Sequence, residues 1–147
     1  MAALVQARLV EKETLGSKYF RLKVEAPDMA REAHPGQFVQ IRCGETLDPF
    51  LRRPLSIHRF HREEGTVEFL VQRKGKGTGW LGRREPGQCL DLLGPLGKGF
   101  TLKQDQETLL VGGGIGVAPL LALAEALAQL GRPPEVLIGA NSREDLL

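Results

Sequence analysis

The chain has 147 residues, enough for one domain or for one domain and part of a second. Apolar residues make up 41% and charged residues 26%, as in ordinary soluble globular proteins, so a core can form without disulfide cross-links. A net charge of +2 without a dense Lys/Arg tract argues against nucleic acid as a partner.

The first two thirds of the chain predict short strands separated by glycine and proline turns. Apolar and polar residues alternate over residues 4–13 and 18–25, across a short Gly/Ser connection, which predicts an antiparallel pair. Further strands are expected at residues 37–43, 54–61, 66–73 and 88–93, and a single helical turn at residues 29–34. This succession favours a small antiparallel β-barrel or sandwich that ends near residue 102.

The pattern changes after residue 102. Residues 107–111 and 135–140 predict short buried strands, and residues 120–130 between them predict a helix rich in Leu and Ala. This is a βαβ unit, whose strands should be parallel. One such unit cannot cover both faces of its sheet, so residues 103–147 should be an incomplete α/β domain. Either the chain is a fragment of a longer protein, which we favour, or another subunit completes the domain.

The two cysteines, Cys43 and Cys89, lie far apart in the sequence among apolar neighbours. Two such residues predict neither a disulfide framework nor a metal site, so we expect buried free thiols in a reducing cytoplasm. The N-terminus lacks the features of a signal peptide. Residues 109–124 are uncharged but are too short for a membrane-spanning helix and contain a run of glycines, so no membrane span is expected.

Two stretches of the barrel region suit an anionic ligand. Arg53 can grip phosphate oxygens bidentately, and Pro54 fixes the backbone that follows it. A solvated basic turn ahead of a strand is the alternative. Residues 75–78 offer the N–H groups of glycines before Thr78, which we predict to be the N-cap of a short helix. A flexible glycine turn is the alternative there, and the residue order excludes a Walker-type loop.

A third glycine-rich stretch, at residues 112–116, joins a predicted strand to a predicted helix. It is similar to a dinucleotide-binding loop, although its glycines run Gly-Gly-Gly-x-Gly, and a tight strand-to-helix connection would explain it equally well. His58 and His61 have no third ligand-type neighbour in motif spacing, so we interpret them as strand-surface or turn histidines.

The order of these motifs is specific. Along the chain there follow Pro-Gly-Gln-Phe at 35–38, Arg-Pro-Leu-Ser at 53–56, Gly-Lys-Gly-Thr at 75–78, Gly-Pro-Leu-Gly at 94–97 and the glycine turn at 112–119. In this order they resemble the ferredoxin–NADP reductase superfamily, most closely the electron-transfer subunits of class 1B dihydroorotate dehydrogenase. The doubled arginine at 52–53 and the Gly-Lys-Gly-Thr segment point to that branch. The resemblance covers nearly the whole chain.

The resemblance implies an FAD-binding Greek-key β-barrel domain at residues 1–102 and the N-terminal part of a Rossmann-like NAD-binding α/β domain at residues 103–147. Electrons would pass from NADH through FAD and a 2Fe–2S cluster to FMN in a partner catalytic subunit that oxidises dihydroorotate in pyrimidine biosynthesis. The four cysteines that hold this cluster near the family's C-terminus are absent here. Other candidates are a related NAD(P)H reductase subunit, such as sulfhydrogenase gamma, and a non-catalytic flavin-binding or scaffold module.

The resemblance also implies roles for individual residues. Arg53 would hold the FAD pyrophosphate together with Gly77 and Thr78, and Ser56 would lie near the reactive edge of the flavin as the catalytic position. The other implied contacts are Pro54, Leu55, Leu70, Val71 and Gln72 for the flavin and Gly113, Gly114 and Gly116 for NAD. The family favours NADH, whereas Arg143 after the last strand would permit NADPH.

Overall fold

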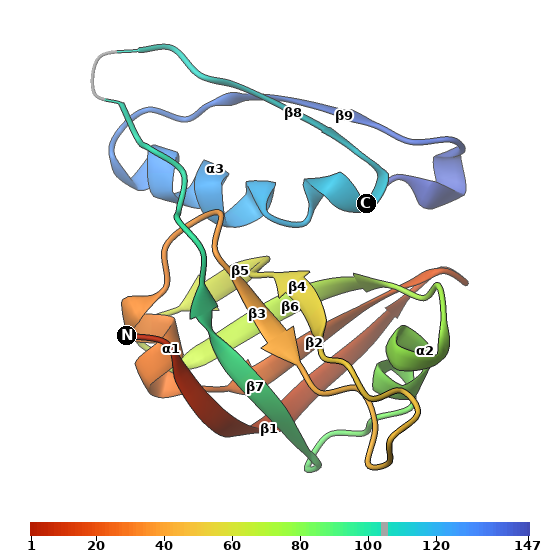
Figure 1. Cartoon of the computed structure of the whole chain (residues 1–147). Helices are drawn as coiled ribbons and strands as arrows, with labels where there is room; N and C mark the ends of the chain where they lie inside the picture. Colours follow the sequence, from red (N-terminus) through yellow and green to blue (C-terminus); the bar gives the residue numbers. More distant parts are fainter. Residues whose placement is uncertain (104–105) are drawn as a thin grey trace.

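The computed structural model describes residues 1–103 and 106–147. Figure 1 shows a β-barrel with a smaller α/β layer stacked on one end. The elements of the barrel unit are, in chain order, β1 (Ala3–Leu15), β2 (Tyr19–Glu25), α1 (Pro27–Glu32), β3 (Phe38–Ile41), β4 (Arg53–Ser56), β5 (Arg59–His61), β6 (Thr66–Gln72), α2 (Lys76–Gly82) and β7 (Cys89–Leu96). Those of the α/β layer are β8 (Leu109–Gly113), η1 (Gly114–Val117), α3 (Leu120–Gln129), β9 (Glu135–Gly139) and η2 (Arg143–Asp145), where η is a 3₁₀ turn.

The barrel is an antiparallel sheet that curls until its two end strands meet. Over the described residues the strand order is β4-β3-β7-β1-β2-β6-β5. The N–H of Ile57 donates to the Gln37 carbonyl beside β3 (3.0 Å), and the N–H of His58 donates to the Glu68 carbonyl on β6 (2.9 Å). The chain therefore crosses from one end of the sheet to the other within two residues. The single strand predicted over residues 54–61 is wrong, because this crossing divides it into β4 and β5.

The interior of the barrel is filled by every second side chain of its strands. On β2, for example, Phe20, Leu22 and Val24 are at most 1% exposed. The predicted antiparallel pairing of the first two strands is confirmed. Cys43 is buried as expected, but Cys89 is exposed. The prediction for Cys89 is wrong because the neighbouring Leu90 points into the core, which turns the preceding side chain outward.

The α/β layer contains the predicted βαβ unit, with β8 and β9 parallel and α3 between this small sheet and the barrel (Figure 1). Leu110 of β8 packs against Leu123 and Leu127 of α3. The strand predicted as buried at residues 135–140 is instead exposed along its whole length as β9. The predicted domain boundary at residues 102/103 adjoins residues 104–105, which lie outside the described residues, and it stays a prediction.

Candidate functional site

Strands β4 and β6 of the barrel lie side by side without a hydrogen-bonded ladder between them. In the described part of the chain β4 pairs only with β3, and β5 accompanies β6 only over Thr66–Glu68. Residues 69–72 of β6 therefore pair on one edge, with β2. An edge of this kind offers backbone N–H and C=O groups to a ligand. The residues with implied flavin contacts on β4 and β6 thus flank the place where the barrel wall has no hydrogen-bonded ladder, which we call the opening.

One end of this opening unites two of the predicted phosphate-binding residues. A Cβ atom on Gly77 would lie 3.2 Å from Arg53 Nε and 3.2 Å from Cys43 Cβ, so the Arg53 side chain lies against α2 and any larger residue at position 77 would crowd it. Arg53 Nη1 donates to the Leu51 carbonyl (2.8 Å), and no described carboxylate pairs with this side chain. Its remaining N–H groups are therefore available to an anion.

The start of α2 adds backbone donors at the same place. Gly75 is the N-cap residue, and the Thr78 hydroxyl oxygen accepts the N–H groups of Lys74 (2.9 Å) and Gly75 (3.2 Å). The prediction of Thr78 as N-cap is wrong, because this side chain reaches back from inside the first turn. The N–H groups of that turn, including the one of Gly77, have no intrahelical acceptors. Beside the Arg53 guanidinium, they suit a phosphate group.

The side chain of Cys43 lies close to both Arg53 and Gly77. Burial raises the pKa of this thiol to about 11, although the charge of Arg53 acts in the opposite direction. The thiol is therefore protonated and uncharged at neutral pH, and it does not neutralise the positive charge of Arg53. The anion-binding character of this end of the opening is preserved.

The glycine turn of the α/β layer lies beside β6. Leu70 of β6 forms a small apolar cluster with Val117 and Ala118, just after that turn. A Cβ on Gly112 would lie 2.7 Å from Leu120 Cδ1, so Gly112 is needed for close packing of α3 on β8. By contrast, a Cβ on Gly114 or Gly116 would meet nothing within 4 Å. Of the implied NAD residues, these two thus border open space, and Gly113 precedes them at the end of β8.

Sequence reasoning missed the role of His58, which the structure places between the two units. The His58 Nδ1 atom lies 2.7 Å from the Ala118 carbonyl, so it must donate a proton there, and the His58 carbonyl accepts the N–H of Ala122 (3.1 Å). Burial lowers the pKa of His58. Arg59 adds an ion pair with Glu125 of α3 (2.6 Å). The sequence contained one signal for this role: His58 follows Ser56, the last residue of the Arg-Pro-Leu-Ser motif, by only two residues.

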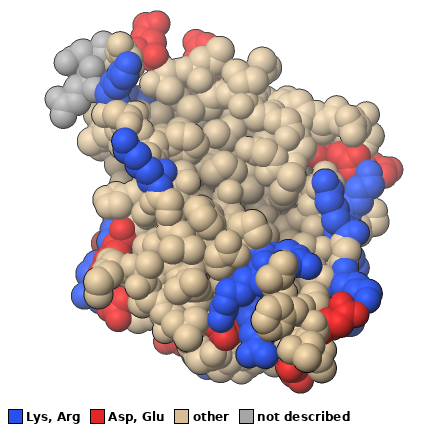
Figure 2. All heavy atoms as spheres, viewed as in Figure 1, with Lys and Arg blue, Asp and Glu red and all other residues tan. Residues whose placement is uncertain are grey.

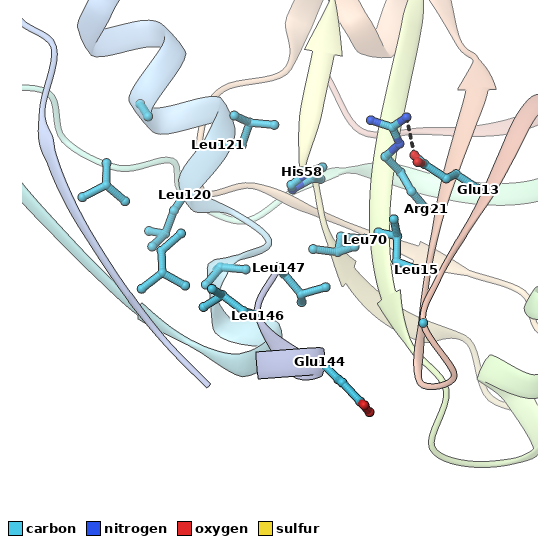
Figure 3. A pocket seen from close by; sticks show the side chains of 15 residues that line it. Glu13, Leu15, Arg21, His58, Leu70, Leu120, Leu121, Glu144, Leu146 and Leu147 are labelled. Atoms are coloured by element: carbon cyan, nitrogen blue, oxygen red, sulfur yellow. Dashed lines mark ion pairs between the residues drawn. The ribbon is translucent and has the colours of Figure 1, made fainter. Parts of the chain in front are cut away.

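A separate cavity of about 610 Å³ lies between the barrel and the α/β layer (Figure 3). Leucines from both units line it, among them Leu70 of β6 and Leu120 and Leu121 of α3, and an Arg21–Glu13 ion pair (2.7 Å) lies on the barrel side. Its described wall does not include Arg53, Ser56 or Gly77. This apolar cavity therefore lies away from the Arg53 end of the opening between β4 and β6, and the two share Leu70.

Within residues 1–103 and 106–147, no group of three or more His, Cys, Asp or Glu side chains is placed to hold a metal ion. None of the helices described is long and apolar enough to cross a membrane.

A barrel edge with an arginine and a helix start at one end, beside a βαβ glycine turn, suits a flavin nucleotide. Residues 6–100 match the family model described as the oxidoreductase FAD-binding domain, and the chain belongs to that family. It is 40% identical to the electron transfer subunit of dihydroorotate dehydrogenase B (NAD(+)) from Desulforamulus reducens, matching 100% of this chain and 56% of that protein. The subunit of the same name from Geobacillus thermodenitrificans is 40% identical over 84% of this chain and 49% of its own length.

Solved structures agree with this assignment. An NADH-dependent reduced ferredoxin-NADP oxidoreductase, studied for flavin-based electron bifurcation, superposes with a TM-score of 0.87 and 33% identity, over 97% of this chain and 51% of that one. The ferredoxin reductase in carbazole 1,9a-dioxygenase gives a TM-score of 0.84 and 25% identity, over 99% and 46%. The predicted fold class, a flavin-domain barrel followed by a partial α/β unit, is confirmed. The chain spans about half the length of the curated relatives it matches.

Proposed function

We propose that this chain is the flavin-binding part of an electron-transfer subunit that passes electrons from NADH through FAD towards the catalytic subunit of a dihydroorotate dehydrogenase in pyrimidine biosynthesis. The relatives at 40% identity carry that name and support the assignment of the acceptor. One observation carries the flavin role: the Arg53 guanidinium lies against Gly77 at the start of α2, without a carboxylate partner among the described residues.

The residues of this site fit FAD. Arg53 and the N–H groups of Gly77 and Thr78 would hold the pyrophosphate, since a guanidinium and a helix start both favour anions. Backbone groups along two half-paired strand edges would hold the flavin ring, whose amide-like edge needs donors and acceptors in alternation. The strand residues assigned to this contact are Pro54, Leu55 and Ser56 on β4 and Leu70, Val71 and Gln72 on β6.

The glycine turn between β8 and α3 would bind the second substrate, the nicotinamide nucleotide. Open backbone at Gly114 and Gly116, next to Gly113, would let a nicotinamide nucleotide approach closely. Bound FAD would supply the chemistry, accepting a hydride and passing its electrons on. The chain's own part is to orient and shield: Ser56 would border the reactive edge of the ring, and the Leu70 cluster would keep water from one side of it.

Flavin titration of the purified chain tests the proposal. We expect added FAD to be retained after gel filtration and its absorption to bleach when NADH is supplied. A colourless chain that takes up no FAD would overturn the flavin role. FAD that binds but does not respond to NADH would leave a flavin-holding module in place of a reductase.

The electron acceptor needs its own experiment, because the similarity to a ferredoxin-NADP oxidoreductase favours a second candidate, another NAD(P)H reductase subunit. The chain should co-elute with a dihydroorotate dehydrogenase catalytic subunit that binds FMN. Co-elution with a ferredoxin instead, under the same conditions, would favour the second candidate.

A further inference from the structure

His58 connects the strand of the proposed flavin site to the segment that follows the glycine turn. It lies two residues after Ser56 of β4, the residue proposed at the reactive edge of the flavin. The backbone between them is fixed from both sides, because the N–H of Ile57 donates to the Gln37 carbonyl (3.0 Å) and the N–H of His58 donates to the Glu68 carbonyl (2.9 Å). Ile57 is also fully buried in the barrel core. The imidazole therefore starts from a fixed place relative to the flavin strand.

Two hydrogen bonds link this residue to the end of the glycine turn. His58 Nδ1 lies 2.7 Å from the carbonyl of Ala118, just after η1, and the His58 carbonyl accepts the N–H of Ala122 (3.1 Å) in the first turn of α3. Burial lowers the pKa of His58, so the ring is neutral at pH 7, and its one proton is on Nδ1 because a carbonyl oxygen only accepts. Within the described part of the chain, both hydrogen bonds that reach residues 114–122 from the barrel come from His58.

The other contacts between the two units do not fix the position of the turn. The cluster of Leu70 touches it through apolar atoms, whose attraction has no preferred direction. The ion pairs Arg59–Glu125 (2.6 Å) and Lys18–Asp145 (2.9 Å) hold α3 and η2, respectively, to the barrel. Figure 2 shows mainly uncharged side chains where the α/β layer meets the barrel. Since a hydrogen bond is directional, the bonds of the histidine set the register of the turn.

Hydride transfer depends on such a register. In the proposed reaction a hydride leaves NADH, which becomes NAD⁺, and FAD takes up the hydride with its two electrons. The reacting atoms must approach to about 3–3.5 Å, and a misplacement of about 1 Å can slow the step roughly 100-fold. The flavin edge is proposed to lie at Ser56 and the nicotinamide at Gly114 and Gly116. The hydrogen bonds of His58 connect these two places.

We propose that His58 is a positioning residue for hydride transfer: its bonds to Ala118 and Ala122 hold the glycine turn at the distance from the flavin edge that the transfer requires. This inference rests on the proposed flavin function and adds to it a residue that acts through the segment it holds. In this role the imidazole gives no proton to the reaction. Its Nδ1–H group is the part that matters.

The test measures how fast NADH bleaches FAD bound to the full chain, by stopped flow over a range of NADH concentrations. Leu and Asn have nearly the same shape, but only Asn keeps an N–H donor in the place of Nδ1. His58→Leu should fold, since leucines line the neighbouring cavity. It should slow bleaching at saturating NADH about 10- to 100-fold and leave FAD affinity unchanged. His58→Asn should recover most of the rate.

Two further variants serve as controls. His34→Leu makes the same substitution at an exposed histidine of the barrel unit and should leave the rate unchanged. Arg59→Gln weakens the contact between the units without removing either hydrogen bond of His58, and it should change the rate by about twofold or less. Equal slowing in Arg59→Gln and His58→Leu would show that any loosening of the units has this effect, and it would overturn the inference.

The remaining outcomes separate this inference from the function on which it rests. FAD that does not bind to the unchanged chain, or that NADH does not bleach, would overturn both. An unchanged rate in His58→Leu, or equal slowing in His58→Leu and His58→Asn, would overturn the positioning role while the flavin function stands. Full recovery of His58→Leu at high NADH concentration would assign the residue to NADH binding alone, and loss of FAD from this variant would assign it to the flavin site. Either result would also overturn the positioning role.

Discussion

The two units of this molecule bury their apolar side chains to very different extents. The barrel closes through Ile57 and His58, and residues such as Phe69 are fully buried inside it. In the α/β layer one face of the small sheet packs on α3, while Leu109, Val111 and Leu137 on the other face are 59%, 64% and 59% exposed. The barrel therefore has a closed core, whereas the α/β layer buries apolar side chains on only one face of its sheet.

The largest effect should come from truncating a barrel core residue. Phe69→Ala leaves a cavity and should lower the free energy of unfolding by roughly 3–5 kcal/mol. Leu137→Ala on the exposed face of the α/β layer should change it by no more than about 0.5 kcal/mol. Urea unfolding of both variants measures the difference. Similar losses at the two positions would contradict the comparison, because they would place Leu137 in a packed core.

Removal of the Arg53 side chain should weaken FAD binding without preventing folding. Arg53→Ala should weaken FAD binding by about 10- to 100-fold, since a charge-assisted hydrogen bond contributes roughly 1.5–3 kcal/mol. The midpoint of thermal unfolding should move by only a few degrees, because the described contacts of this side chain are to exposed or half-buried carbonyls. Arg8→Ala, at an exposed arginine of β1, is the control. Unchanged flavin occupancy in Arg53→Ala would remove Arg53 from the site.

The contact between the units should weaken in acid. Burial lowers the pKa of His58 in the docked state, so the exposed imidazole takes up a proton more readily than the docked one. This contribution to stability is complete above the ordinary pKa of about 6.5 and is lost as the pH falls from there through the lowered pKa. Glu68, Arg21 and Arg59 are the charged groups that act on this ring.

Hydrogen exchange at the start of α3, corrected for the intrinsic pH dependence of exchange, measures this effect. Protection of the Ala122 N–H, which donates to His58, should fall between neutral pH and pH 5.5. In His58→Gln the same change of pH should have a smaller effect. An identical fall in the variant would show that another group causes the weakening.

The smallest effect should come from the Arg59–Glu125 ion pair. Both side chains are about one third exposed, so the pair should contribute only roughly 0.2–1 kcal/mol. A double-mutant cycle with Arg59→Gln and Glu125→Gln, read from thermal unfolding in low salt, gives the coupling energy. The coupling should shrink when salt is added. A larger, salt-independent value would mean that this pair, rather than His58, dominates the docking.

The sequence predicted most strands of the barrel because alternation and glycine or proline turns are local signals. It did not predict the break between β4 and β5, since the acceptors for Ile57 and His58 lie on strands at opposite ends of the sheet. It could not show that β9 is exposed, because a run of Val, Leu and Ile looks the same whether or not a second layer covers it.

The same distinction holds for the site. The sequence placed Arg53 and Gly77 in motifs, and the structure brings the two motifs into contact. The Lys76–Asp48 and Arg52–Asp91 pairs join residues that are 28 and 39 positions apart, and no local pattern announces either contact. The N-cap of α2 was missed because Gly75 has no side chain to signal it, and Thr78 is a good capping residue elsewhere.

The two cysteines differ in burial, so labelling of the unchanged chain with a thiol reagent can report on the barrel wall. A thiol-reactive dye attacks the thiolate, and Cys43 is buried with its pKa raised to about 11, so at pH 8 the dye should attach to Cys89 alone. Cys43 lies against Gly77, inside the wall that faces the proposed pyrophosphate. The rate at which the dye labels Cys43 would therefore measure how often that wall opens, without any engineered residue.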